Sequence, residues 1–240
     1  RLSQPHRKHA RPMSLITLSN LTKVYTETAS DVVAVDSVQL TLEAGEFAAL
    51  VGPSGCGKTT LLNLIGGLDR PSAGSVCVNG TDLSTLSDAD LVRFRLEHIG
   101  FVFQAYNLIP VLTALENTVF ILELQGVAAA ERNRRGMELL DAVGLADKAH
   151  HRPAQLSGGQ QQRVAVARAL ASKPAFVLAD EPTANLDSKS ASTLLDIMLE
   201  LNRAEGTLFL FSTHDPRVVD RARRTFHLED GRVLREEQTS

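Results

Sequence analysis

The sequence predicts an α/β protein, and three observations lead to this fold class. Short β-rich runs alternate with longer helical ones along the 240 residues. Two β-rich runs, Phe47–Val51 and Phe176–Ala179, are continuously apolar, as expected of central parallel strands that are buried on both faces. The β signal then disappears between about residues 105 and 157, which indicates a helical insertion in the α/β domain.

The individual strands are expected where apolar and β-branched residues lie between turn residues. In Val38–Leu42, apolar and polar residues alternate, which suits a more exposed sheet. The full set of expected strands is Ile16–Leu18, Val38–Leu42, Phe47–Val51, Val76–Val78, Ile99–Phe103, Phe176–Asp180, Leu208–Ser212 and Thr225–Leu228.

The expected helices have apolar residues at helical spacing. Ser188–Arg203 directly follows Asp187, a good N-cap residue, and carries leucines over its turns. Ala129–Val143 mixes apolar residues with charges, and Gln160–Ser172 is rich in strong helix formers. Thr60–Ile65 has the apolar character of a helix start.

Charge and cysteine content exclude several classes of protein. The formal net charge of −3 gives no electrostatic reason to expect nucleic acid as a ligand. The two cysteines, Cys56 and Cys77, form no metal-binding pattern and suit a reducing compartment. The longest run without charge, His98 to Leu115, contains Gln104, Asn107 and Pro110 and is shorter than the ~20 apolar residues of a spanning helix. We therefore expect no direct membrane span.

The first twelve residues are basic and lack the apolar stretch of a secretory signal. We interpret residues 1–12 as a disordered leader, a cloning remnant or a misplaced start, and residues 13–240 as one domain. The expected location is the cytoplasm.

A phosphate-binding loop follows the strand Phe47–Val51. Residues 52–59 satisfy the pattern G-x-x-x-x-G-K-[ST] between an apolar strand and an apolar helix start. Glycines let backbone N–H groups turn toward phosphates, and the helix N-terminus adds positive charge. Lys58 is expected to reach the β- and γ-phosphates and Thr59 to bind Mg²⁺. The loop alone would fit a GTPase, a kinase or a motor equally well.

Two further segments narrow the class. Leu156–Gln160 (LSGGQ) precedes a strong helix, so a second set of free N–H groups is expected at its start. The apolar strand Phe176–Asp180 ends in Asp180 and Glu181. An Asp at such a strand end can hold the Mg²⁺ shell, and the adjacent Glu can orient or deprotonate an attacking water.

Taken together, these motifs resemble the ATP-binding cassette (ABC) ATPases over nearly all of the chain from Leu15 onward. The motifs stand in the family's order: the phosphate loop, Gln104 in GFVFQ, LSGGQ, LADEP at 178–182, the loop 184–187, and His214 in FSTHD. An aromatic residue, Tyr25 in KVY, stands where this family stacks the adenine. Alone, Gln104, His214 or Tyr25 would more often be a structural residue, but the joint order of the motifs is highly specific. The segments 66–74, 100–117 and 155–170 are similar to the LolD and MacB ATPases, with FtsE a more distant relative.

The resemblance implies a P-loop NTPase fold. A RecA-like core of about residues 13–104 and 160–240 would hold a parallel sheet and an antiparallel β-subdomain, and about residues 105–159 would form the helical subdomain. The resemblance also implies a homodimer that encloses two ATP molecules, each held between one copy's loop and the other copy's LSGGQ segment.

The resemblance also assigns roles to residues. Glu181 would be the general base, His214 would steady the γ-phosphate, and Lys58 and Gln104 would also take part in catalysis. Thr59, Gln104 and Asp180 would hold Mg²⁺. The expected nucleotide-binding residues are Tyr25, Gly52, Pro53, Ser54, Gly55, Cys56, Gly57, Lys58, Thr59, Thr60, Ser157, Gly158, Gly159, Gln160 and Asp187.

The implied function is ATP hydrolysis that drives a separate FtsX/MacB-type permease from the cytoplasmic face of the membrane. The cargo would be a lipoprotein, peptide, antibiotic or lipid-like molecule. The permease would dock beside Gln104, on residues 105–109, although Leu108 and Ile109 could instead be core. Two alternatives remain: a mechanical FtsE-like regulator of cell-wall hydrolases, and a soluble ABC ATPase without transport.

Overall fold

The computed structural model describes residues 14–26 and 31–239 of the chain, so the leader expected at residues 1–12 lies outside the described residues. The strands are β1 (Ile16–Tyr25), β2 (Val32–Leu42), β3 (Phe47–Val51), β4 (Ala73–Val78), β5 (Thr81–Asp82), β6 (Ile99–Val102), β7 (Phe176–Asp180), β8 (Leu208–Thr213), β9 (Arg224–Glu229) and β10 (Arg232–Gln238). The α-helices are α1 (Lys58–Ile65), α2 (Asp88–His98), α3 (Ala114–Leu124), α4 (Ala129–Ala142), α5 (Gly158–Leu170), α6 (Ser188–Glu205) and α7 (Pro216–Val219). Short 3-10 helices lie at Leu83–Thr85, Ala146–Lys148 and Pro153–Gln155.

The larger sheet has the strand order β10-β9-β3-β8-β7-β6. Its strands run parallel from β9 to β6, and β10 pairs antiparallel with β9. The predicted bounds of β3 and β7 agree with the structure. The predicted α/β fold class is thereby confirmed, and the carboxyl ends of the parallel strands meet at one edge of the sheet.

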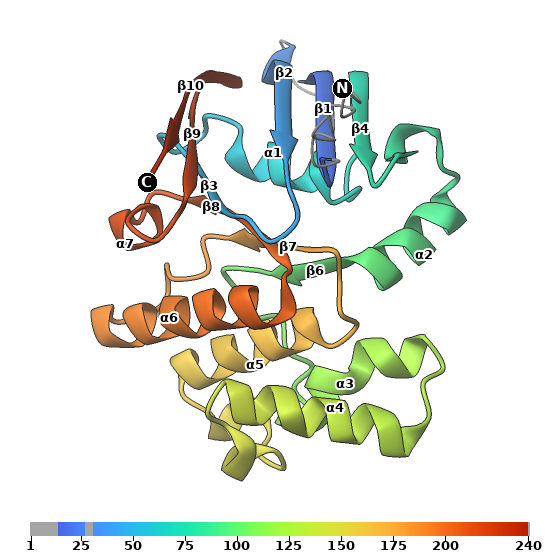
Figure 1. Ribbon diagram of the computed structural model, residues 1–240, viewed down its shortest axis with the longest axis vertical. Coiled ribbons are helices and arrows are strands. Elements are labelled where there is room, and N and C mark those ends of the chain that lie inside the picture. Colours follow the sequence, from blue (N-terminus) through green and yellow to red (C-terminus); the bar gives the residue numbers. More distant parts are fainter. Residues whose placement is uncertain (1–13, 27–30, 240) are drawn as a thin grey trace, which may run out of the picture.

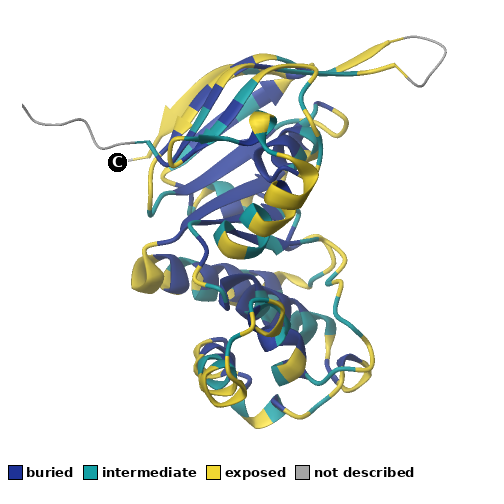
Figure 2. Cartoon of the chain, turned by 90° about the vertical axis from the view of Figure 1, so that its right-hand side faces the viewer, coloured by how far each residue is buried: buried dark blue, intermediate teal, exposed yellow. Residues whose placement is uncertain are grey.

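The continuous apolar run of β3 is explained by two cores on opposite faces of this sheet. Phe47, Ala49 and Val51 pack into the core that contains the helices α3 to α6. Ala48 and Leu50 pack into the core formed with α1 and the second sheet. Because side chains alternate across a strand, both sets of residues must be apolar. Figure 2 shows these strands as a buried layer between half-exposed outer elements.

The smaller sheet is antiparallel, with the order β2-β1-β4-β5. One face of β2 is buried and the other exposed, as the alternation in Val38–Leu42 predicts. β1 and β2 are longer than predicted, and both contain irregular register at residues with positive φ, Asn20 and Ser37. The short β5 and the charged, exposed edge strand β10 were not predicted, because neither has an apolar face that reveals a strand.

Residues 105–157 contain α3 and α4 and no strand, in agreement with the predicted helical insertion. The two helices lie at the opposite end of the molecule from the antiparallel sheet, with α5 and α6 between (Figure 1). The side chain of Thr113 and that of Glu116 cap α3 reciprocally. Helix α2 was not predicted because Leu91 is its one buried residue among the described side chains.

Candidate functional site

A cleft of about 650 Å³ opens where β3, β7 and β8 end. It collects the phosphate loop that follows β3, Glu181 after β7, His214 after β8 and Gln104 after β6. Sequence segments that are more than a hundred residues apart therefore share one site. The lining residues are Val32, Val33, Ala34, Gly52, Pro53, Ser54, Gly55, Gly57, Lys58, Thr59, Thr60, Gln104, Glu181, Ala184, Ser212 and His214.

The phosphate loop is held so closely by its neighbours that two positions admit only glycine. A Cβ atom on Gly52 would lie 2.2 Å from the carbonyl oxygen of Leu228, and one on Gly57 would lie 2.1 Å from that of Ala34. Gly57 also has a φ of +101°, which L side chains rarely adopt. The Gly231 N–H donates to the Cys56 carbonyl at 3.0 Å. The turn between β9 and β10 thus fixes the shape of the loop.

Lys58 begins α1 and is 8% exposed. Its ammonium group donates to the carbonyl oxygens of Gly52 (2.8 Å) and Pro53 (3.0 Å). The ammonium is therefore curled inside the loop, where the N-terminus of α1 also presents N–H groups. A glycine-rich cradle with a buried cation inside it suits a polyphosphate.

The hydroxyl of Thr59 donates to both carboxylate oxygens of Asp180, at 3.0 and 3.2 Å. Gln104 is exposed in the same cleft, and the Asn185 side-chain amide donates to its backbone carbonyl at 3.0 Å. No cluster of three or more His, Cys, Asp or Glu is placed to hold a metal in residues 14–26 and 31–239. The hydroxyl, carboxylate and amide oxygens of Thr59, Asp180 and Gln104 are nevertheless the donor types that suit Mg²⁺.

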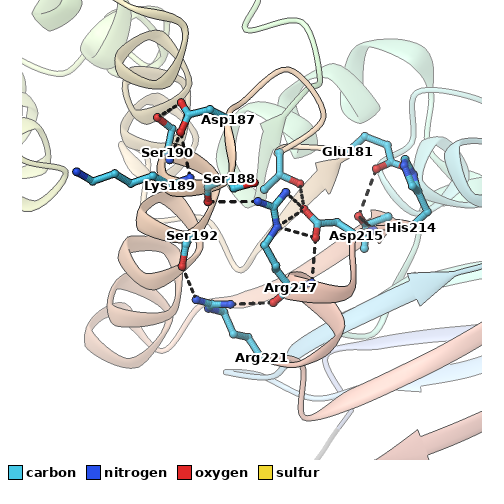
Figure 3. A network of polar contacts seen from close by, with 12 residues as sticks. Glu181, Asp187, Ser188, Lys189, Ser190, Ser192, His214, Asp215, Arg217 and Arg221 are labelled. Atoms are coloured by element: carbon cyan, nitrogen blue, oxygen red, sulfur yellow. Dashed lines mark hydrogen bonds and ion pairs between the residues drawn. The ribbon is translucent and has the colours of Figure 1, made fainter.

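Glu181 and His214 contact one another across the cleft. Glu181 Oε1 lies 2.7 Å from His214 Nδ1, and the Thr213 hydroxyl donates to Glu181 Oε2 at 3.2 Å (Figure 3). The Glu181 N–H donates to the Ser212 carbonyl at 2.8 Å. Glu181 has a φ of +44°, a strained value for a residue with a side chain, of the kind that collects at functional sites. An imidazole that donates from Nδ1 to this carboxylate keeps Nε2 free to face the cleft.

The LSGGQ segment lies outside the set of described residues that line this cleft. Ser157 caps α5: its Oγ accepts from the Gln160 N–H at 3.3 Å, and Gln160 Oε1 accepts from the Ser157 N–H at 2.8 Å. Ser157 is exposed, and the N–H groups of Gly158 and Gly159 follow it at the helix start. This chain thus has two separate anion-suited helix ends, α1 and α5.

Tyr25 and Asp187 also lie outside the cleft lining. The Tyr25 hydroxyl donates to Asp69 at 2.9 Å, and the Lys23 ammonium lies 4.9 Å from the ring centroid. Burial raises the pKa of the Tyr25 phenol, and its hydrogen bond to Asp69 raises it further. Asp187 caps α6 by accepting from the Lys189 and Ser190 N–H groups, each at 3.0 Å.

Sequence reasoning missed several residues that shape the site. Gln162 is fully buried, and its amide donates to the Phe103 carbonyl (3.1 Å) and the Pro182 carbonyl (2.8 Å). It thereby joins α5 to the residues beside Gln104 and Glu181. Val32–Ala34 line the cleft from β2. Gln162 lies in the predicted helix next to LSGGQ, but its partners depend on the tertiary fold, and Val32–Ala34 carry no motif at all.

Among residues 14–26 and 31–239, no helix is both long enough and apolar enough to cross a bilayer.

Comparisons with known proteins agree with this geometry. The sequence profile of the family described as ABC transporter matches residues 35–184. The lipoprotein-releasing system ATP-binding protein LolD of Anaeromyxobacter dehalogenans is 50% identical over 220 residues, which cover 91% of this chain and 92% of that protein. The macrolide export ATP-binding/permease protein MacB of Burkholderia pseudomallei is 47% identical over 92% of this chain, but the chain spans 34% of the length of MacB.

A solved structure shares the fold. It is the dimeric, post-hydrolysis state of the ATP-binding cassette MJ0796 bound to ADP and Pi, with a TM-score of 0.85 and 43% sequence identity. The match covers 93% of this chain and 98% of that one.

Proposed function

This chain belongs to the ABC transporter family as an ATP-binding component that hydrolyses ATP, and we propose that it drives a separate membrane permease of the FtsX/MacB type. The observation that carries the ATPase part of the proposal is the convergence of Lys58, Thr59, Glu181 and His214 on one cleft, with Asp180 bonded to the Thr59 hydroxyl. The similarity to LolD and MacB proteins over more than nine-tenths of the chain supports the type of permease.

In the proposed reaction, each residue of the cleft has a task that follows from its chemistry. The loop N–H groups and Lys58 bind the phosphates of ATP, because they present positive charge in a glycine-rich cradle. Glu181 orients the attacking water and accepts its proton, and His214 holds the Glu181 carboxylate and faces the γ-phosphate. Thr59, Gln104 and Asp180 would hold Mg²⁺, which when bound would neutralise charge that develops on the phosphates.

The proposed active unit is a dimer of this chain. Ser157, Gly158 and Gly159 lie at an exposed helix end outside the cleft, so a second copy must supply this helix end if it is to touch the same ATP. The dimeric state of MJ0796 supports this arrangement. Asp187 and Tyr25 would act at the borders of the closed site, Asp187 toward the second copy and Tyr25 on the adenine ring. Within each copy, we propose a core of about residues 13–104 and 160–240 and a helical subdomain of about residues 105–159.

The proposed permease contact lies on the segment after Gln104, at the cytoplasmic face of the membrane. Ala105 and Asn107 are exposed there, and Val111 is 70% exposed. Leu108 instead packs against the core that contains the helices α3 to α6, so its apolar side chain serves the fold rather than the docking surface.

The catalytic part of the proposal is tested with Glu181→Gln. The amide cannot accept a proton, so this variant should bind ATP, lose about 10²- to 10⁴-fold in phosphate release and accumulate as an ATP-bound dimer in size-exclusion chromatography. Phosphate release near the wild-type rate would refute the role of Glu181.

The dimer is tested with Ser157→Arg, which should leave ATP binding by the monomer unchanged and prevent both dimerisation and hydrolysis. Hydrolysis that survives this change would refute the shared site. Co-purification with a membrane protein that has a large extracytoplasmic domain would support the permease, and its absence from membrane extracts would contradict it.

A further inference from the structure

The residue that follows His214 is a buried carboxylate with no assigned role in the proposed reaction. Asp215 is 8% exposed and lies between β8 and α7. Its carboxylate accepts hydrogen bonds from the Thr183 hydroxyl at 2.7 Å and from the Arg217 guanidinium at 2.7 to 3.1 Å. It also accepts from the Arg217 N–H at 2.9 Å. Figure 3 shows these contacts converging on the carboxylate.

The partners of Asp215 come from the segments that carry the other residues of the site. Thr183 is two residues beyond Glu181. Arg217 also donates from Nη1 to the Ser188 carbonyl at 3.2 Å, directly after Asp187 at the start of α6. Asp215 is itself bonded to His214. One carboxylate and its arginine thus tie together the chain around Glu181, His214 and Asp187.

A second line of contacts leads from Asp215 to the Glu181 side chain. The Asp215 N–H donates to the Thr213 hydroxyl at 3.0 Å, and the same hydroxyl donates to Glu181 Oε2 at 3.2 Å. Arg221, two residues after the end of α7, supports the assembly by donating to the Arg217 carbonyl at 3.0 Å and to the Ser192 hydroxyl of α6 at 2.9 Å. The bonds between the Arg217 guanidinium and the Asp215 carboxylate are charge-assisted, and such bonds are about twice as strong as neutral ones.

We propose that Asp215, together with Arg217 and Thr183, is a positioning residue that keeps His214 and the Asp187 end of α6 in fixed register with Glu181. Displacement of any one of these segments on nucleotide binding then moves the others, so the state of the cleft is transmitted to the start of α6. This inference rests on the proposed function, because it assumes the roles given above to Glu181 and His214.

The alternative is that Asp215 only caps α7. Its bond to the Arg217 N–H is the cap of that short helix. Asparagine is an equally good cap residue, but it lacks the charge that holds the Arg217 guanidinium. Asp215→Asn therefore preserves the cap of α7 and weakens the contact between residue 215 and the Arg217 guanidinium. Thr183→Val removes the second contact and leaves the cap intact.

The experiment compares steady-state ATP hydrolysis by these two variants with the wild-type protein. If these contacts position His214, each variant should have a kcat that is lower by about 10- to 100-fold and a KM for ATP that changes little. The reason is that misplacement of a catalytic group affects the transition state. The matched control is Asp196→Asn, which removes the charge of an exposed α6 carboxylate that lies 2.8 Å from Arg221. Arg221 keeps its bonds to the Arg217 carbonyl and the Ser192 hydroxyl in this variant, so kcat should stay unchanged.

A double-mutant cycle separates positioning from structural damage. In a His214→Ala background, Asp215→Asn should cause no further loss of single-turnover phosphate release, because the group it positions is already absent. The inference is overturned if kcat of Asp215→Asn stays normal, or if its loss adds in full to that of His214→Ala. Glu181→Gln is measured alongside. If Glu181→Gln hydrolyses ATP at the wild-type rate, the proposed function itself is wrong. If Glu181→Gln loses ATP hydrolysis while Asp215→Asn keeps a wild-type kcat, this inference alone is refuted.

Discussion

The ion pair between the buried Asp215 and the half-buried Arg217 makes a quantitative prediction about stability in acid. Burial disfavours the ionised carboxylate and acts to raise the pKa of Asp215, but hydrogen bonds from Arg217 and Thr183 outweigh it and lower this pKa from 3.8 to about 2. Because the pKa is lower in the folded state, ionised Asp215 stabilises the fold at every pH above the unfolded value near 3.8. This stabilisation is lost as the pH falls from that value toward the folded pKa.

The pKa difference between 3.8 and about 2 corresponds to about 2 kcal/mol of unfolding free energy at neutral pH. Asp215→Asn should remove most of it, which lowers Tm by about 4 to 8 °C for a chain of this length. At pH 3, about half of the wild-type advantage should be gone, since the unfolded carboxylate is then largely protonated.

The assay is thermal unfolding at pH 7 and pH 3, followed by far-UV circular dichroism because the chain contains no Trp. Asp196→Asn is again the control, since exposed ion pairs contribute less than about 1 kcal/mol. A Tm difference between the wild-type protein and Asp215→Asn that is equal at pH 7 and pH 3 would refute the reasoning.

Three further predictions follow from single contacts. Gly57→Ala should weaken ATP binding at least ~10-fold in a titration with a fluorescent ATP analogue, because its Cβ would lie 2.1 Å from a backbone carbonyl oxygen. The control is Gly80→Ala, because Gly80 has a similar positive φ but a Cβ added there meets no described atom within 4 Å. Equal ATP binding by the two variants would contradict the argument. Gln162→Leu should lower the unfolding free energy by about 1 to 3 kcal/mol in thermal melts, since two carbonyls lose their donor; an unchanged Tm would count against it. Asp69→Asn should raise the Kd for ATP by less than ~5-fold by loosening Tyr25, and a larger change would show that Asp69 does more than position the ring.

Much of the fold could be predicted because a parallel sheet leaves a clear pattern in the sequence. β3 and β7 were predicted with correct bounds, since strands with a core on each face must be apolar throughout. The charged strand β10 could not be predicted, because an exposed edge strand needs no apolar face. Helix α2 was missed for the same physical reason.

The position of the cleft follows from the direction of the strands, but its detail depends on their order. Parallel strands place the loop after β3 and the acidic pair at the end of β7 at the same edge of the sheet. That β8 lies between them, and so brings His214 to Glu181, depends on long-range pairing that no local pattern encodes. The same holds for Asp215 and Gln162, whose partners are set by the packing of distant segments.

The cap of α5 shows how a helix end can be held in shape and still serve the proposed dimer. A serine hydroxyl has one donor and two acceptor positions. Ser157 uses one acceptor position to cap Gln160, so its O–H remains able to donate to a phosphate oxygen of a second copy's ATP. Gly158 and Gly159 add N–H groups without side chains that would keep a phosphate at a distance. Because Gln160 completes the cap from its side chain, the helix start needs no ligand to be formed. The second half of the proposed site is therefore preorganised in each copy before two copies meet.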